Sequence, residues 1–159
     1  MEEAFKPDRT PLSILFSLVR TWQVLERYLE LELQKQGSSV TRFALMNSLY
    51  RYGGRLTPTE LAAETFRSKN AITFVLGMLE KEGFVKRVPS DNDGRSVNVV
   101  ITDKGWEKTN NMTPWAQDIS RDILSCLDSG EINTLLIMFR TIRKSLLEKI
   151  DSLERNSSG

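Results

Sequence analysis

The sequence predicts a mainly α-helical protein that carries one small β-hairpin, which is an α+β fold. Apolar residues recur at steps of three and four over most of the 159 residues, and this is the period of an amphipathic helix. Two short runs rich in β-branched residues, 84–88 and 97–101, flank a segment of turn-forming residues and predict the hairpin. A chain of this length is expected to fold as one domain with its own core.

The first helix is expected over residues 11–36. Thr10 is a suitable N-cap, Pro11 suits the first helical turn, and Gly37 ends the segment. Five apolar residues form a seam along this helix: Leu15, Leu18, Trp22, Leu25 and Leu29.

A second helix is expected to begin after Thr41 and to stop at Gly53 and Gly54. A short third helix follows it. Thr57 and Glu60 have the spacing of a capping box, with a proline at the first helical position between them.

Ser68 is expected to cap a fourth helix that ends at Gly83. Three of its apolar residues share one stripe: Ile72, Leu76 and Leu79. The two β-branched runs follow this helix and are expected to form a two-stranded hairpin.

A fifth helix is expected to open at residues 102–105. Pro114 lies inside it and is expected to kink or restart the helix, with Thr113 as the new cap.

The last helix is expected over residues 129–153, behind a capping box formed by Asp128 and Glu131. Its apolar residues have nearly heptad spacing: Ile132, Leu135, Phe139, Ile142, Leu146, Ile150 and Leu153. This seam is larger than a terminal helix needs for itself, and it predicts a partner helix.

The composition excludes several classes of function. The chain has no His and one Cys, which removes Ser-His and Cys-His catalysis and leaves too few ligands for a structural zinc site, so we expect neither an enzyme nor a cofactor. Cys126 lies in an apolar stretch and is expected to be a small core residue. No apolar segment long enough for a signal peptide or a membrane span is found, and a cytoplasmic protein without membrane contact is expected.

The order of these elements, together with five motifs, resembles the MarR family of winged helix-turn-helix transcriptional regulators. The motifs occupy residues 56–62, 68–69, 79–83, 93–96 and 101–105. The resemblance implies a winged helix-turn-helix DNA-binding lobe over 41–105 and dimerisation helices over 1–40 and 106–159. It also implies a homodimer on an inverted-repeat operator in double-stranded DNA, acting as a repressor that a small aromatic or phenolic ligand releases.

In the fourth helix the resemblance implies DNA contacts at its N-terminal end, which enters the major groove. The apolar stripe leaves Lys69, Asn70 and Thr73 on the outer face, where they suit a phosphate or guanine, an adenine and a thymine methyl group respectively. Ser68 caps this end. Phe74 stands where family members often have Arg; it is assigned to thymine contact or to packing, and packing is the favoured interpretation.

The hairpin tip is expected to be the wing. The resemblance makes Asp93 the partner that orients Arg95 in the minor groove, with Ser96 beside it and Lys86 or Arg87 near phosphates. The alternative is an ordinary type I turn in which the Asp caps its own backbone.

Five large side chains lie on the helices between which the family holds its effector: Trp22, Met46, Tyr50, Trp106 and Trp115. They are candidates for the lining of an effector pocket. The alternative is that these large residues fill the junction between the DNA-binding lobe and the dimerisation helices, and this packing is the favoured interpretation. The net charge is +1, and residues 53–104 hold eight basic and seven acidic residues. This balance keeps a second function open, a winged-helix scaffold for proteins that exposes an apolar patch around Phe74 and Met78 and does not bind DNA.

Overall fold

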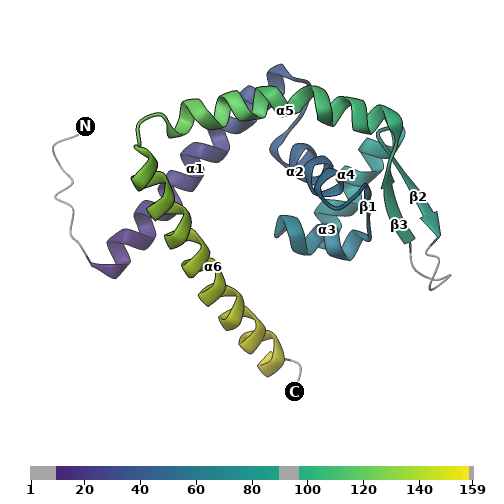
Figure 1. The fold of residues 1–159 in the computed structure, drawn as a ribbon. Coiled ribbons are helices and arrows are strands. Elements are labelled where there is room, and N and C mark those ends of the chain that lie inside the picture. Colours follow the sequence, from purple (N-terminus) through teal and green to yellow (C-terminus); the bar gives the residue numbers. More distant parts are fainter. Residues whose placement is uncertain (1–9, 90–96, 158–159) are drawn as a thin grey trace. The chain divides into compact units, whose positions relative to one another are not determined.

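The computed structural model describes residues 10–89 and 97–157 (Figure 1). These residues form six helices and three strands, and none of the helices is long and apolar enough to cross a membrane. The elements follow one another as α1 (Pro11–Lys35), α2 (Val40–Arg51), β1 (Arg55–Leu56), α3 (Pro58–Thr65), α4 (Lys69–Lys81), β2 (Val85–Pro89), β3 (Val97–Ile101), α5 (Asp103–Leu124) and α6 (Ser129–Ser157).

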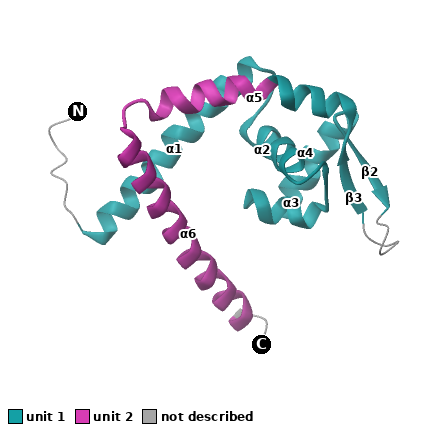
Figure 2. Ribbon diagram, viewed as in Figure 1, with its two compact units in different colours: residues 1–111 teal, residues 112–159 magenta. Residues whose placement is uncertain are grey.

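The chain divides into two compact units, residues 1–111 and 112–159 (Figure 2). The first unit holds α1, the small lobe formed by α2, α3, α4 and the sheet, and the start of α5. The second unit holds the rest of α5 and α6. Each unit is described by itself.

The first two helices begin at side-chain caps. Thr10 accepts a hydrogen bond from the amide of Ser13 (3.3 Å), as the sequence predicts. The prediction for α2 was wrong by two residues, because Ser39 caps the helix and Glu30 of α1 accepts the amide of Val40 (2.9 Å). That carboxylate satisfies an amide which would otherwise lack a partner at the helix N-terminus.

The helix-turn-helix consists of α3, a short turn and α4. The predicted capping box of α3 is confirmed: the amide of Thr57 donates to Glu60 Oε2 (2.7 Å), and the amide of Glu60 donates to Thr57 Oγ1 (3.2 Å). Phe66 ends α3 in the left-handed region, with φ 51°, and Ser68 caps α4 by accepting the amide of Ala71 (3.3 Å).

The sheet has three antiparallel strands in the order β1-β3-β2, which corrects the predicted two-stranded hairpin. Within it β3 pairs with β2 from Val85 opposite Ile101 to Pro89 opposite Val97. On its other side it pairs with β1, where Arg55 lies opposite Val100. Two residues are too few to show a strand period, so the sequence pattern could not reveal β1.

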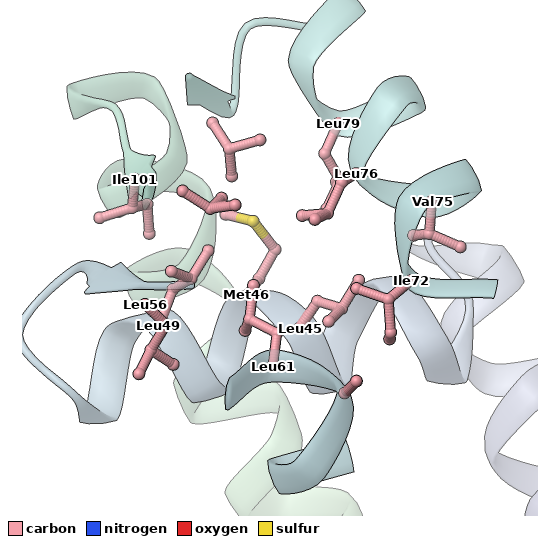
Figure 3. Close-up of a cluster of buried hydrophobic side chains, with 13 residues drawn as sticks. Leu45, Met46, Leu49, Leu56, Leu61, Ile72, Val75, Leu76, Leu79 and Ile101 are labelled. Atoms are coloured by element: carbon pink, nitrogen blue, oxygen red, sulfur yellow. The ribbon is translucent and has the colours of Figure 1, made fainter. Parts of the chain in front are cut away.

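The core of the lobe lies between the sheet and helices α2, α3 and α4 (Figure 3). Its thirteen buried residues are Leu45, Met46, Leu49, Leu56, Leu61, Ala62, Ile72, Val75, Leu76, Leu79, Val85, Val99 and Ile101. The predicted stripe of α4 lies wholly inside it. Full burial of one such side chain stabilises the fold by about 1.5–3 kcal/mol, so the stripe fixes how α4 is rotated about its axis.

The start of α5 is packed tightly against Phe84, the residue that precedes β2. A Cβ atom at Gly105 would lie 2.2 Å from the carbonyl oxygen of Phe84, so the residue must be glycine for the helix to approach. Thr102 reinforces the contact, since its hydroxyl donates to the carbonyl of Gly83 (2.6 Å).

Two expectations for the C-terminal helices need correction. The restart that was one of the two alternatives at Pro114 does not occur, because α5 continues as one helix to Leu124. The other alternative, a kink, stays a prediction. Cys126 is exposed and is not a core residue, because it lies in the turn between α5 and α6. The capping box of α6 is confirmed, with both of its hydrogen bonds between Asp128 and Glu131 at 2.9 Å.

The capping box of α3 predicts an acid-sensitive contribution to stability. The hydrogen bond from the backbone of Thr57, followed by that from its hydroxyl, lowers the pKa of Glu60. A lowered folded-state pKa means that the contribution is complete above the ordinary Glu pKa of about 4.3 and is lost as the pH falls through the folded-state value.

We therefore expect Glu60→Gln to lower Tm at pH 7 and the difference from the parent protein to shrink as the pH falls below about 4. Thr57→Ala should lower Tm by about 2–4 °C, the effect of losing a cap worth about 1 kcal/mol. Thermal melts from pH 3 to pH 7 measure both, with Glu107→Gln on α5 as the control for loss of charge. A Tm difference for Glu60→Gln that stayed constant over this range would contradict the prediction.

Candidate functional site

The helix α4 presents a polar and aromatic face on the side opposite the core. Ile72, Leu76 and Leu79 are at most 1% exposed, and the helical period therefore turns the residues between them outward. The exposed residues in its first two turns are Lys69, Asn70, Ala71, Thr73 and Phe74.

Two hydroxyl groups at this end are used by the helix itself. Ser68 Oγ is the N-cap, and Thr73 Oγ1 donates to the carbonyl of Lys69 (2.8 Å). The hydroxyl proton of Thr73 is thus committed to its own helix, and its methyl group and lone pairs are what it offers to an outside partner.

Phe74 does not pack inward, which corrects the favoured interpretation of the sequence. Its side chain is 70% exposed, because it lies four residues after Asn70 and shares its outward direction. Met78 packs against the core instead. The apolar patch expected around both residues is therefore limited, on this helix, to Phe74.

In β2, Lys86 and Arg87 are both exposed and point to opposite faces of the strand, since side chains alternate along a strand. Arg87 is tied to α4: its guanidinium lies 3.1 Å from Glu80 Oε2, and its amide donates to Glu80 Oε1 (3.2 Å). The structure thus brings Arg87 next to α4, whereas Lys86 stands apart from this ion pair.

The predicted tip of the wing, Asp93, Arg95 and Ser96, lies outside the described residues. Its assignment stays a prediction from the sequence. The strands on either side of the tip are described: β2 ends at Pro89 and β3 begins at Val97.

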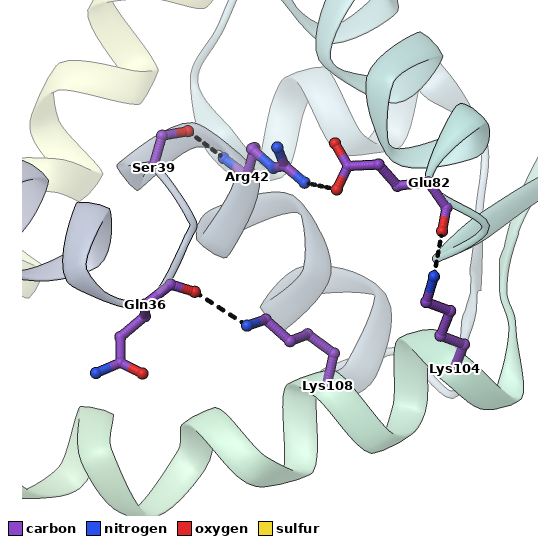
Figure 4. Close-up of polar contacts among 6 residues, drawn as sticks. All are labelled: Gln36, Ser39, Arg42, Glu82, Lys104 and Lys108. Atoms are coloured by element: carbon purple, nitrogen blue, oxygen red, sulfur yellow. Dashed lines mark hydrogen bonds and ion pairs between the residues drawn. The ribbon is translucent and has the colours of Figure 1, made fainter.

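Polar contacts hold the start of α5 against the end of α4 and the connection between α1 and α2 (Figure 4). Lys104 Nζ donates to the carbonyl of Glu82 (2.8 Å), and the carboxylate of Glu82 pairs with Arg42 of α2. Lys108 Nζ donates to the carbonyl of Gln36 (3.0 Å). Three elements that are distant in sequence are thereby joined at one corner of the lobe.

Two of the five predicted effector residues are in contact. The rings of Tyr50 and Trp106 meet edge to face at 5.1 Å, and Met46 is buried in the core against which Trp106 packs. Trp22 is 49% exposed on α1 and takes no part in this ring pair, and Trp115 belongs to the second unit.

Two cavities among the described residues lie elsewhere. One, of about 530 Å³, is lined by residues at the start of α6, among them Glu131 and Met138, and the other, of about 380 Å³, by residues of α1. Both are open. Over the described ranges, no group of three or more His, Cys, Asp or Glu side chains is placed to hold a metal ion.

Besides the pair between Arg42 and Glu82, two ion pairs of the first unit were not predicted from the sequence. They are the pair between Glu80 and Arg87 and the pair between Glu26 of α1 and Arg67 (3.0 Å). The first had a signal in the sequence, because the turn at Gly83 folds β2 back over the end of α4. The second joins residues 41 positions apart and had none.

The helices α1 and α6 each expose a long series of large apolar residues. On α1 these are Leu12, Ile14, Leu15, Phe16, Val19, Trp22, Val24 and Leu31. On α6 they are Ile132, Leu136, Ile137, Met138, Phe139, Ile142, Leu146, Leu147, Ile150 and Leu153. Such continuous apolar surfaces are typical of interfaces.

Comparison with known proteins agrees with the helix-turn-helix geometry. Residues 39–97 match the model of the MarR family. The chain is 27% identical to the transcriptional regulator PecS of Dickeya dadantii over 142 residues, which cover 88% of this chain and 86% of PecS. It is 29% identical to the transcriptional repressor MprA of Escherichia coli over 125 residues, which cover 78% of this chain and 69% of MprA.

A solved structure extends the likeness to the fold. A mutant of MarR from Escherichia coli, complexed with operator DNA, is 27% identical, and it superposes with a TM-score of 0.71 over 83% of this chain and 93% of that one. The exposed face of α4 thus belongs to a fold that has been observed on DNA.

Proposed function

Because this chain belongs to the MarR family of transcriptional regulators, which are not enzymes, we propose that it is a homodimeric repressor. It recognises an inverted-repeat operator and is released from it by a small aromatic ligand. The observation that carries the proposal is the outward face of α4, where Lys69, Asn70 and Thr73 stand exposed on a helix held rigidly by its buried stripe.

The charges around α4 support binding to DNA in spite of the neutral composition. Two acidic residues at the end of the helix are paired with arginines, Glu80 with Arg87 and Glu82 with Arg42. Lys69, Lys81 and Lys86 are exposed around the same helix. Local cation density near the groove matters more for phosphate contact than the net charge of the chain.

A protein-binding scaffold is the second candidate, and the 70% exposure of Phe74 is the observation that favours it. A scaffold would need a contiguous apolar surface on α4. Met78 packs against the core, so the exposed apolar side chains of α4 are Phe74 and the small Ala71, which make less than the contiguous apolar surface that a protein partner needs.

The DNA-binding proposal predicts two different kinds of defect. Asn70→Ala should relax sequence preference and leave non-specific binding nearly intact, because a base contact carries the sequence information. Arg95→Ala should weaken binding to every duplex by about 1–3 kcal/mol and lower the salt slope by roughly one unit, as expected for a minor-groove cation. Asp93→Ala should give a smaller defect in the same direction.

These variants are compared on one duplex enriched from a random pool and on one unselected duplex, at several salt concentrations. Failure of the parent protein to enrich any duplex would favour the scaffold. Equal binding of Arg95→Ala and parent protein to both duplexes would remove the wing from the DNA interface.

The dimer proposal rests on the apolar surfaces of α1 and α6, which would be costly to leave in water. We expect the pair of substitutions Leu146→Asp and Ile150→Asp to convert the dimer into a monomer, because each would bury a charge in the seam of α6. Light scattering measures the mass. Lys149→Glu, a charge change at an exposed residue of the same helix, is the control. A dimer that survived the double substitution unchanged would place the interface elsewhere.

The effector proposal rests on the Tyr50–Trp106 pair, which is partly exposed at the edge of the core. Aromatic carboxylates or phenols that bind there should raise Tm by mass action, quench the fluorescence of Trp106 and weaken binding to the enriched duplex. Tyr50→Leu should reduce all three effects. If a panel of such compounds changed neither Tm nor DNA affinity, the pair would be a structural contact only.

A further inference from the structure

We propose that α4 lays an apolar strip against the bases, in which Phe74 covers the 5-methyl group of a thymine and Gly77 lets the duplex come close. This proposal rests on the DNA-binding function proposed above and adds the chemical group that is read. Its observations come from the described residues of α4.

The strip follows from the geometry of the helix. Asn70, Phe74, Gly77 and Lys81 are separated by four, three and four residues, which places them in one line along the face opposite the buried stripe. In this line Asn70 offers donor and acceptor groups, Phe74 an apolar ring, and Lys81 an exposed cation at the far end.

Among the described residues, Phe74 is not part of the core and does not pack against it. Its ring is 70% exposed although its neighbours on the buried side are almost fully covered. An exposed aromatic ring that lies between the amide of Asn70 and the ammonium group of Lys81 suits a binding partner whose surface has both hydrogen-bonding groups and an apolar group. The major groove provides such a surface, because only thymine places a methyl group there.

Gly77 is the second, independent observation. It lies in the interior of α4, where glycine is less favourable than alanine, and a Cβ atom built there would meet nothing within 4 Å. Its φ is not positive, so neither backbone conformation nor packing requires glycine. The remaining physical reason for a glycine is the close approach of a molecule outside the chain.

The charges at the two ends of the strip are complementary to a duplex. Lys69 lies at one end of the line and Lys81 at the other. The two acidic residues next to Lys81 are each paired with an arginine, Glu80 with Arg87 and Glu82 with Arg42. Phosphates flanking the groove would therefore meet cations at both ends of an uncharged reading surface.

Thymine-to-uracil replacement tests the contact with Phe74, because it removes the methyl group alone. A duplex enriched by the parent protein is synthesised with deoxyuridine at each thymine in turn, in both half-sites. At one position the parent protein should lose about fourfold in affinity per half-site, the effect of burying one methyl group. Phe74→Ala should bind the thymine duplex about fivefold or more weakly and show no further loss with deoxyuridine.

Two control variants accompany this test. Phe74→Leu keeps an apolar side chain and should retain part of the sensitivity to the methyl group. Phe66→Ala removes another exposed ring, 66% exposed at the end of α3, and should bind like the parent protein.

Gly77→Ala tests the close approach through two effects of opposite sign. It should raise Tm by about 2–4 °C, since alanine favours the helix and meets no atom of the chain. It should also weaken binding to the enriched duplex. A variant that was more stable and bound DNA as tightly as the parent protein would show that the duplex does not approach Gly77.

The outcomes separate this proposal from the function on which it rests. No enriched duplex would overturn the DNA-binding function and the strip with it. Enrichment without a deoxyuridine effect at any thymine would overturn the role of Phe74 alone. An equal deoxyuridine effect in the parent protein and in Phe74→Ala would assign the methyl group to another residue, for which Thr73→Ser is the variant to examine.

Discussion

Burial of Ile72, Leu76 and Leu79 is the interaction on which the rest of the site depends. These side chains enter a core built by α2, α3 and the sheet, and together they contribute several kilocalories per mole (about 1.5–3 kcal/mol each). Rotating α4 about its axis would take these three side chains out of the core. It would also bring Lys69 and Asn70 into the core without hydrogen-bond partners, which is costly. The outward direction of Phe74 and Gly77 is therefore a consequence of packing on the far side of the helix.

Ion pairs and a hydrogen bond also fix the elements next to α4 relative to this helix. Glu80 pairs with Arg87 in the middle of β2. Glu82 joins the end of α4 to Arg42 of α2 and to Lys104 of α5. Each exposed pair contributes little to stability by itself. Their effect is on position, because α4, β2 and the first turn of α5 share one set of contacts. A ligand that altered the position of α5 near Trp106 would act on the same contacts.

Caps, breakers and apolar stripes were predicted well because they are local. Thr10, Thr57, Ser68 and Asp128 each cap the helix that the sequence assigned to them, since a cap depends on residues within one turn. The start of α2 was misplaced because Thr41, two residues after the actual cap Ser39, is also a suitable capping residue. The strand β1 was missed because its two residues pair only with a strand more than forty positions away.

The sequence alone therefore determined which segments are helices, which stripe of α4 is buried, and which residue types occupy its exposed face, because these properties arise from periodicity and from contacts within a few residues. The same period places Phe74 opposite that stripe, although its apolar character favoured packing. Only the tertiary structure decided that Met78 packs against the core, that Arg87 is tied to Glu80 and that Tyr50 meets Trp106. The direction of a side chain near the edge of a stripe depends on which partners the rest of the fold brings to it, and those partners are distant in the chain.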